Sequence, residues 1–313
     1  MTSIAYWPTA VDYANLPLLP YACVDIGSNT TRLLVAEPAD GRLRELMTQR
    51  AFTSLGKATS KGRIPGDKIE ETAEVVATQA RLARELGAED IAVVATAAVR
   101  SAKNRDEFGA AVEAESGLAV RVLSGHEEAR LAFLGATRTF SGPLDGSIAV
   151  VDVGGGSTEV VVGTLADGAS WEESFRIGSG FLADSYLRSD PPGASELEAV
   201  RLHVSGTFEG LDVPPALHAV ATGGSANALR RLVGAELLYD TLERAIRILA
   251  STPIAEVAKR FELDPERVRV LPAGVLIFEE ISQTLGLPLS VGKGGVREGV
   301  ILDLLSNDLA VTS

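Results

Sequence analysis

The sequence predicts an α/β protein built from two similar domains with a cleft between them. The chain has 313 residues, which is long for one hydrophobic core and suits two domains. The segments VDIGSNTTRLLVAE and VDVGGGSTEVVVG resemble one another, and their aspartates, Asp25 and Asp152, are 127 positions apart. Short apolar runs alternate with helix-like stretches in both halves, as expected for strands alternating with helices. A unit used twice indicates a duplicated domain.

In the first half, apolar runs over residues 21–26 and 31–37 predict two strands around the turn Gly27-Ser28-Asn29-Thr30. Asp40-Gly41 predicts a hairpin turn after them. Pro65 precedes an amphipathic helix that runs to about Leu86 and ends at Gly87. The remaining expected elements are a buried strand over residues 91–95, a helix over 104–116, a strand over 119–123 and a helix over 124–137.

In the second half, the order of elements begins again. Strands over residues 147–153 and 159–163 flank a second glycine turn, and a strand over 216–221 precedes a turn and a helix that begins at Ala226. An apolar helix over 272–285, a strand over 287–291 and a helix of about ten residues complete the chain. We expect one domain over residues 1–128, with 1–20 as an extension, and a second over 129–298. Residues 299–313 form a terminal helix that could pack back on the first domain.

Composition excludes several classes of protein. A net charge of −13 and a pI of about 4.8 argue against general nucleic-acid binding, which usually needs a basic surface. No apolar run approaches the roughly 20 residues of a membrane helix, and the first twenty residues lack the basic start of a signal peptide. The single cysteine, Cys23, excludes an internal disulfide and suits a reducing cytoplasm.

Both glycine turns have the composition of phosphate-binding loops. Glycine lets the backbone approach a ligand, and successive amides and hydroxyls then converge on phosphate oxygens. One such hairpin could as easily be structural, but two matching hairpins favour a shared phosphate site. The predicted phosphate-binding residues of the two loops are Gly27, Ser28, Asn29, Thr30, Arg32, Gly154, Gly155, Gly156, Ser157 and Thr158.

Carboxylates at the loops predict a metal site. Asp25 ends the first strand, and Asp152 and Glu159 lie at opposite ends of the second loop. Carboxylates beside a phosphate are unfavourable unless a cation lies between them. Mg²⁺ suits this set, with Mn²⁺ as a substitute, because Mg²⁺ is bound by few carboxylates together with substrate phosphates. Glu159 could instead be an ordinary solvated strand residue.

Seven motifs carry a resemblance to a known family: DIGSNTTRLLVAE, ATAAVRSAKN, LSGHEEARLAFLGA, VDVGGGSTE, ATGGSANAL, PAGVLIFEEI and GKGGVREGVI. They span residues 22–302 and resemble the exopolyphosphatase and guanosine pentaphosphate phosphohydrolase family in its short, two-domain form. That family belongs to the superfold of actin, heat-shock chaperones and sugar kinases. The resemblance therefore implies two ribonuclease H-like domains of the actin-like ATPase type.

The resemblance also implies roles for single residues. The family's proposed base is the glutamate directly before the alanine of the EEA step, which is Glu128 here. Spacing alone would make Glu127 and Glu128 ordinary acids at a helix N-terminus. Arg100 is an expected phosphate contact, and Lys293 and Arg297 are expected to contact more distant phosphates, although each of the three could be a surface charge.

The implied function is Mg²⁺-dependent, processive release of terminal orthophosphate from inorganic polyphosphate in the cytoplasm, by a homodimer. Hydrolysis of guanosine pentaphosphate at the same site is the alternative. A kinase of the superfold, an actin-like filament subunit and a non-enzymatic phosphate-chain sensor are more distant alternatives. The turn Thr222-Gly223-Gly224-Ser225 resembles the adenosine loop of the kinases, and the sequence does not say whether it binds a nucleoside.

Overall fold

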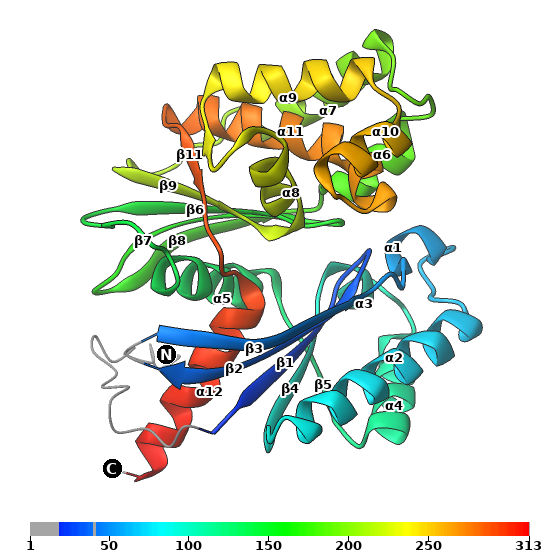
Figure 1. Ribbon diagram of the computed structural model, residues 1–313, viewed down its shortest axis with the longest axis vertical. Helices are drawn as coiled ribbons and strands as arrows, with labels where there is room; N and C mark the ends of the chain where they lie inside the picture. Colours follow the sequence, from blue (N-terminus) through cyan, green and yellow to red (C-terminus); the bar gives the residue numbers. More distant parts are fainter. Residues whose placement is uncertain (1–18, 40–41, 313) are drawn as a thin grey trace.

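The structure is a computed structural model that describes residues 19–39 and 42–312, with side chains described up to Asn307. The predicted turn at Asp40-Gly41 and nearly all of the predicted N-terminal extension lie outside these residues. Two β-sheets, each covered by helices, make up the described part of the chain (Figure 1).

The first sheet has the strand order β3-β2-β1-β4-β5. Strands β1 to β3 pair antiparallel, and β4 and β5 add parallel strands beside β1. The strands are β1 Tyr21–Ile26, β2 Thr31–Ala39, β3 Arg42–Ala51, β4 Asp90–Ala95 and β5 Val120–Val122. The helices of this half are α1 Leu55–Ala58, α2 Gly66–Glu85, α3 Ala97–Arg100 and α4 Arg105–Ser116.

The second sheet repeats this order with one additional edge strand, as β10-β11-β9-β6-β7-β8. Its strands are β6 Ile148–Val153, β7 Thr158–Thr164, β8 Gly168–Phe175, β9 His218–Thr222, β10 Glu236–Leu237 and β11 Leu289–Val291. Its helices are α6 Ser179–Tyr186, α7 Ala194–Phe208, α8 Gly223–Val233, α9 Tyr239–Ser251, α10 Ile254–Phe261 and α11 Pro265–Leu285. The shared order β3-β2-β1-β4-β5 and β8-β7-β6-β9-β11 agrees with a duplicated unit.

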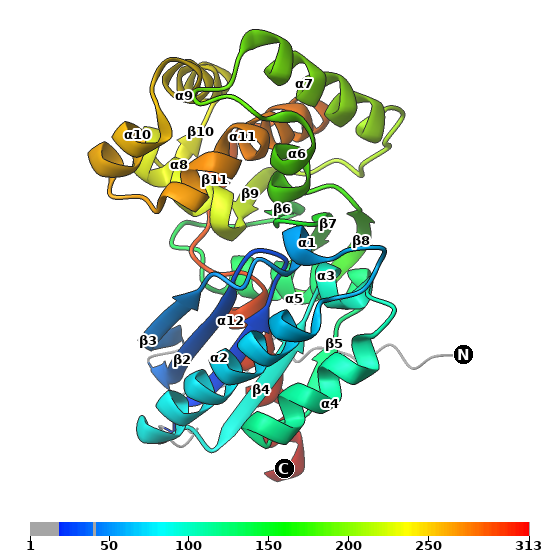
Figure 2. The same ribbon diagram turned by 90° about the vertical axis from the view of Figure 1, so that its right-hand side faces the viewer.

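Two helices lie between the sheets and form a middle layer, α5 Gly125–Arg138 and α12 Val296–Thr312 (Figure 1). One face of helix α5 packs on β6, β7 and β9 of the second sheet. Another face of α5, together with α12, packs on the first sheet. Helices α2 and α4 cover the outer face of the first sheet. Figure 2 shows α1 and α3 below α6, at the edge where the two halves meet.

Strand alternation directs one aspartate of each half into this middle layer. Cys23 of β1 packs in the core formed with α5 and α12, and Val150 of β6 packs in the core formed with α5. Side chains two residues apart on a strand share a face. Asp25 and Asp152, each two residues further along its strand, therefore point toward the layer that contains α5 and α12.

The predicted strands and helices are confirmed in type, and the structure adds short or peripheral elements that were not predicted, namely α1, α3, β8, α6, α7, β10, α9 and α10. Three further differences concern β3, α11 and α12. The exposed edge strand β3 was not predicted, because its charged sequence lacks an apolar face. Helix α11 begins at Pro265 and not at Pro272, because the Asp264 side chain caps it by accepting the Glu266 amide at 2.9 Å. Helix α12 has 17 residues where about ten were expected.

Within the described residues, no helix combines the length and apolar character needed to cross a membrane.

Glycines allow α5 and α12 to cross at very short range. A Cβ added at Gly135 would lie 1.9 Å from the Gly295 carbonyl oxygen, and one added at Gly299 would lie 1.9 Å from the Leu131 carbonyl oxygen. Both obstacles are backbone atoms, which cannot move aside without separating the helices. The middle layer therefore depends on side-chain-free positions in both helices.

We expect Gly299→Ala to lower the free energy of unfolding by about 1–3 kcal/mol or more, because it overpacks the helix crossing. Gly109→Ala in α4 is the matched control, since a Cβ there meets nothing within 4 Å. The control should be neutral or more stable by up to about 1 kcal/mol, owing to helix propensity. Urea denaturation of both variants measures this, and equal stability of the two would contradict the packing argument.

Candidate functional site

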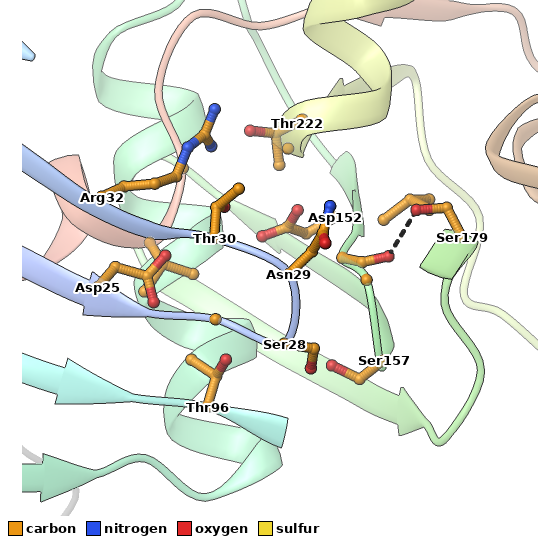
Figure 3. Close-up of a pocket in the computed structure, with 18 of the residues that line it drawn as sticks. Asp25, Ser28, Asn29, Thr30, Arg32, Thr96, Asp152, Ser157, Ser179 and Thr222 are labelled. Atoms are coloured by element: carbon orange, nitrogen blue, oxygen red, sulfur yellow. Dashed lines mark hydrogen bonds between the residues drawn. The ribbon is translucent and has the colours of Figure 1, made fainter. Parts of the chain in front are cut away.

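The two glycine loops are closed by equivalent backbone hydrogen bonds, and residues of both loops line the pocket in Figure 3. In the first loop the Gly27 amide donates to the Thr30 carbonyl at 3.0 Å, and in the second the Gly154 amide donates to the Ser157 carbonyl at 3.0 Å. These pairs are again 127 positions apart. The internal resemblance therefore extends from sequence to the hydrogen bond that closes each hairpin.

Neighbouring segments hold the loop carbonyls and leave loop amides free. The Gly56 amide donates to the Ser28 carbonyl at 2.8 Å, and the Phe181 amide donates to the Gly155 carbonyl at 2.9 Å. Within the described part of the chain, the amides of Ser28, Asn29, Gly155 and Gly156 make no hydrogen bond. Successive free amides in a glycine turn form an anion-binding concavity.

The two loops also touch one another. A Cβ at Gly156 would lie 2.5 Å from the Ser28 hydroxyl oxygen, and one at Gly155 would lie 3.5 Å from the Asn29 Cβ. Gly178 backs the second loop, because a Cβ there would lie 2.6 Å from the Gly156 amide nitrogen. Both loops thus line one cavity of about 110 Å³, where they face each other across the domain junction.

Four carboxylates line this cavity, namely Asp25, Glu128, Asp152 and Glu298. Burial and, to a smaller extent, the nearby Asp25 carboxylate together raise the pKa of Asp152 to about 7. Burial also raises the pKa of Asp25, with Arg297 and Arg32 acting in the opposite direction. Oδ1 of Asp25 is buried without a hydrogen-bond partner in the described structure.

Glu128 is fixed by an arginine from the first domain. Nη1 of Arg100 lies 2.6 Å from Glu128 Oε2 and 2.9 Å from the Leu123 carbonyl oxygen. Burial raises the pKa of Glu128 to about 7, the Arg100 ion pair opposes this shift, and Asp152 and Asp25 add to it. At neutral pH such a carboxyl group is able to accept or return a proton.

The preceding glutamate has a structural role. Glu127 and Ser124 form a capping box at the start of α5, and Glu127 pairs with Arg121 at 2.9 Å. Hydrogen bonds from Ser124 and Arg121 outweigh partial burial and lower the pKa of Glu127 to about 2. Glu127 is therefore a surface carboxylate, whereas Glu128 lies in the cavity.

Basic side chains from both domains face the carboxylates. Arg32, Lys293 and Arg297 line the cavity, and so does Arg267 from the first turn of α11. Arg32 and Arg267 form no ion pair within the described structure. Burial lowers the pKa of Arg32 to about 9, and Arg297 and Arg267 lower it further by repulsion. Buried arginines that repel one another form a site for an anion.

Residues 34–308 match the Ppx/GppA phosphatase family. The chain belongs to that family. It is 30% identical to exopolyphosphatase 2 of Mycobacterium tuberculosis over 94% of this chain and 100% of that protein. It is 28% identical to a guanosine-5'-triphosphate,3'-diphosphate pyrophosphatase of Aeromonas salmonicida, over 94% of this chain and 60% of that protein.

Solved structures agree with this family. An Aquifex aeolicus PPX-GPPA enzyme is 31% identical and superimposes with a TM-score of 0.76, covering 92% of this chain and all of that one. An exopolyphosphatase from Cytophaga hutchinsonii, 19% identical, shares the fold with a TM-score of 0.81 over 92% of this chain and 98% of that chain. The predicted fold class, two similar actin-like domains, is confirmed.

Most predicted site residues of this Ppx/GppA protein meet in the cavity, and three do not line it. The hydroxyl of Thr158 donates to the Ile177 carbonyl at 2.7 Å and its side chain is buried, so it faces away from the cavity. Glu159 lies just outside, accepting the Ser174 hydroxyl at 2.9 Å. Arg100 contacts the cavity only through Glu128. The predicted residues that do line it are Asp25, Gly27, Ser28, Asn29, Thr30, Arg32, Glu128, Asp152, Gly154, Gly155, Gly156, Ser157, Lys293 and Arg297.

Sequence reasoning missed several residues that the fold brings into the cavity. Arg267 was overlooked because α11 was expected to begin seven residues later, which left this arginine outside any element. A Cβ at Gly224 would lie 2.6 Å from the Arg267 guanidinium, so the TGGS turn and Arg267 are adjacent. Polar and glycine residues of the cavity that were also not predicted include Thr96, Ser179, Gly180, Asn227 and Glu298.

The cavity is suited to a cation that a ligand helps to bind. Within residues 19–39 and 42–312, no three carboxylate, imidazole or thiolate groups form a preformed metal site. Mg²⁺ does not require one, because it is usually bound by one or two carboxylates together with substrate phosphates and water. Asp25 and Asp152 fit this pattern, since both line the cavity and the negative charge of Asp25 disfavours ionisation of Asp152.

The raised pKa of Asp152 predicts a pH-dependent stability effect. The Asp152 carboxyl ionises near pH 4 in the unfolded chain but only near pH 7 in the folded protein. The folded state is therefore destabilised increasingly as the pH rises from about 4, and the loss of stability is complete near pH 7. We expect Asp152→Asn to raise the free energy of unfolding of the metal-free protein by about 3 kcal/mol at pH 8, and by little at pH 4. The exposed Asp212→Asn is the control and should show no such gain. Destabilisation of Asp152→Asn at pH 8 would contradict the burial of an uncompensated charge.

Proposed function

We propose that this protein is an exopolyphosphatase, which releases terminal orthophosphate from inorganic polyphosphate. The observation that supports this most directly is the position of Glu128, a proton acceptor fixed beside two loops with free amides. The name of the Mycobacterium tuberculosis relative agrees with this substrate. The single cysteine and the actin-like fold are the grounds for proposing a cytoplasmic homodimer.

In the proposed mechanism, the loop amides bind the oxygens of the terminal phosphates. Arg32 and Arg267 neutralise further charge and orient the chain end. Glu128, fixed by Arg100, orients a water molecule for in-line attack on the terminal phosphorus and accepts its proton. The products are orthophosphate and a chain shortened by one unit, and retention of that chain in the cavity would make hydrolysis processive.

Asp25 and Asp152 would hold Mg²⁺, or Mn²⁺ in its place, and Glu159 would add negative charge from just outside the cavity. The bound cation would neutralise phosphate charge in this site. The partnerless Oδ1 of Asp25 supports this assignment, because a buried carboxylate oxygen requires either a donor or a cation.

Guanosine pentaphosphate is the second candidate substrate, and the name of the Aeromonas salmonicida relative favours it. It would use the same loops and Glu128, with the nucleoside placed beyond them. Phosphate release from long polyphosphate, tripolyphosphate and guanosine pentaphosphate, measured side by side with Mg²⁺, separates the candidates. Release from none of the three would leave a kinase, a filament subunit or a phosphate-chain sensor as explanations.

We expect Glu128→Gln to lower kcat by about 10²- to 10⁴-fold with KM changed little, because the phosphates are bound by other groups. Glu127→Gln, one position away, should retain activity, since glutamine also completes a capping box. Steady-state phosphate release from polyphosphate measures both. A large loss in Glu127→Gln with an active Glu128→Gln would shift the catalytic role to the neighbouring residue.

Chelation should abolish phosphate release, and Mg²⁺ or Mn²⁺ should restore it. Asp152→Asn should lose about 10²-fold or more in kcat at all pH values while its thermal unfolding remains cooperative, because the cation loses a ligand. Full activity of the wild-type protein in chelator would refute the proposed metal site.

A further inference from the structure

A second cavity borders the two glycine loops. It measures about 440 Å³, and we call it the outer groove. Five residues of the loops line both cavities, namely Ser28, Asn29, Gly155, Gly156 and Ser157. The outer groove is therefore separated from the site cavity only by the loops that would hold the terminal phosphates.

The outer groove begins where the proposed reaction takes place. Arg100 lines the groove and donates to Glu128, which lines the site cavity. Glu128 therefore stands at the junction of the two cavities. Phosphates bound by the amides of the shared loops would therefore lie next to both cavities, and a chain held at these loops would be able to extend into the groove.

Both walls of the outer groove carry basic side chains. Lys57 of α1 comes from the first domain, and Arg176, just after β8, comes from the second. Both are exposed, and neither forms an ion pair within the described residues. Among the described residues that line the groove, Asp184 is the only acid, and it is paired with Arg269 at 2.7 Å. In a chain with a net charge of −13, such a groove is a local concentration of positive charge.

The backbone holds the first wall in a defined position. The Ser54 and Gly56 amides donate to the Asn29 and Ser28 carbonyls at 3.0 and 2.8 Å, which ties α1 to the first loop. Ser54 adopts a left-handed conformation, φ 51°, to begin this turn. A non-glycine residue in that region is strained and persists only where the surrounding structure requires it. Lys57 is thus presented beside the loop by a rigid turn.

We propose that the outer groove binds the phosphate units of a polyphosphate chain that lie beyond the terminal units, with Lys57 and Arg176 as their contacts on opposite walls. This inference rests on the proposed exopolyphosphatase function. It replaces the expectation that Lys293 and Arg297 contact the distal phosphates, because both line the inner cavity. A groove of this kind selects long chains over short ones, since tripolyphosphate would not extend far into it.

The test compares Lys57→Ala/Arg176→Ala with Lys259→Ala/Arg260→Ala, which removes two exposed charges from α10. In the groove variant, the ratio of kcat/KM for long polyphosphate to that for tripolyphosphate should fall by about tenfold, mainly through KM. The slope of log affinity against log salt for long chains should flatten by about 1.4, the value for two lost phosphate contacts on a single strand. The α10 variant should match wild type.

Three results would overturn the proposal: an equal loss on long and short chains, no loss on long chains, or the same loss in the α10 variant. Phe181, 45% exposed in the groove, tests a nucleoside as the occupant instead. If Phe181→Ala raises KM only for guanosine pentaphosphate and the groove variant spares long chains, the groove binds the nucleoside. If the wild-type protein hydrolyses no polyphosphate, the proposed function fails. Equilibrium binding of long polyphosphate to both double variants then still tests whether the groove binds the chain.

Discussion

The burial of like charges in the layer between the two sheets is the constraint on which the site depends. Asp25, Glu128 and Asp152 are carboxylates that line one cavity, and each is more easily protonated than in water. Hydrophobic burial elsewhere must offset this cost, and the large cores of both sheets supply it. Strongly perturbed carboxyl groups in a cleft between domains are typical of functional sites and are rarely the result of packing alone.

Duplication explains how the site acquired two chemically different halves. Asp25 lies opposite Arg32 in the β1–β2 hairpin, and Asp152 lies opposite Glu159 in the β6–β7 hairpin. Directly opposed residues share a face of the sheet, so both pairs point toward the middle layer. One backbone unit therefore delivers an acid and a base from the first domain but two acids from the second. The arginine of the first hairpin suits an anion, and the acids of the second suit a cation that Asp25 of the first hairpin would share.

The sequence was sufficient to predict those parts of the site that depend on local patterns. The glycine loops, Asp25, Asp152 and the Glu128 step each lie within one short segment whose geometry follows from a strand and a turn. Arg267 could not be predicted this way, because its position depends on where α11 begins and how that helix meets the TGGS turn. Thr158 and Glu159 were predicted at the site but do not line the cavity. Strand alternation turns Thr158 toward the Ile177 carbonyl, whereas Glu159 shares the face of Asp152 and accepts the Ser174 hydroxyl of β8.

The charges of the cavity indicate why ligand binding and stability are linked. The cavity contains arginines that repel one another, such as Arg32 and Arg267, and carboxylates that repel one another, such as Asp25 and Asp152. A phosphate chain relieves the first repulsion, and a divalent cation relieves the second. Each ligand also neutralises charge that the other would introduce, so either one should bind more tightly in the presence of the other. If both bind the folded protein as proposed, together they would stabilise the junction of the two domains, where the loops touch.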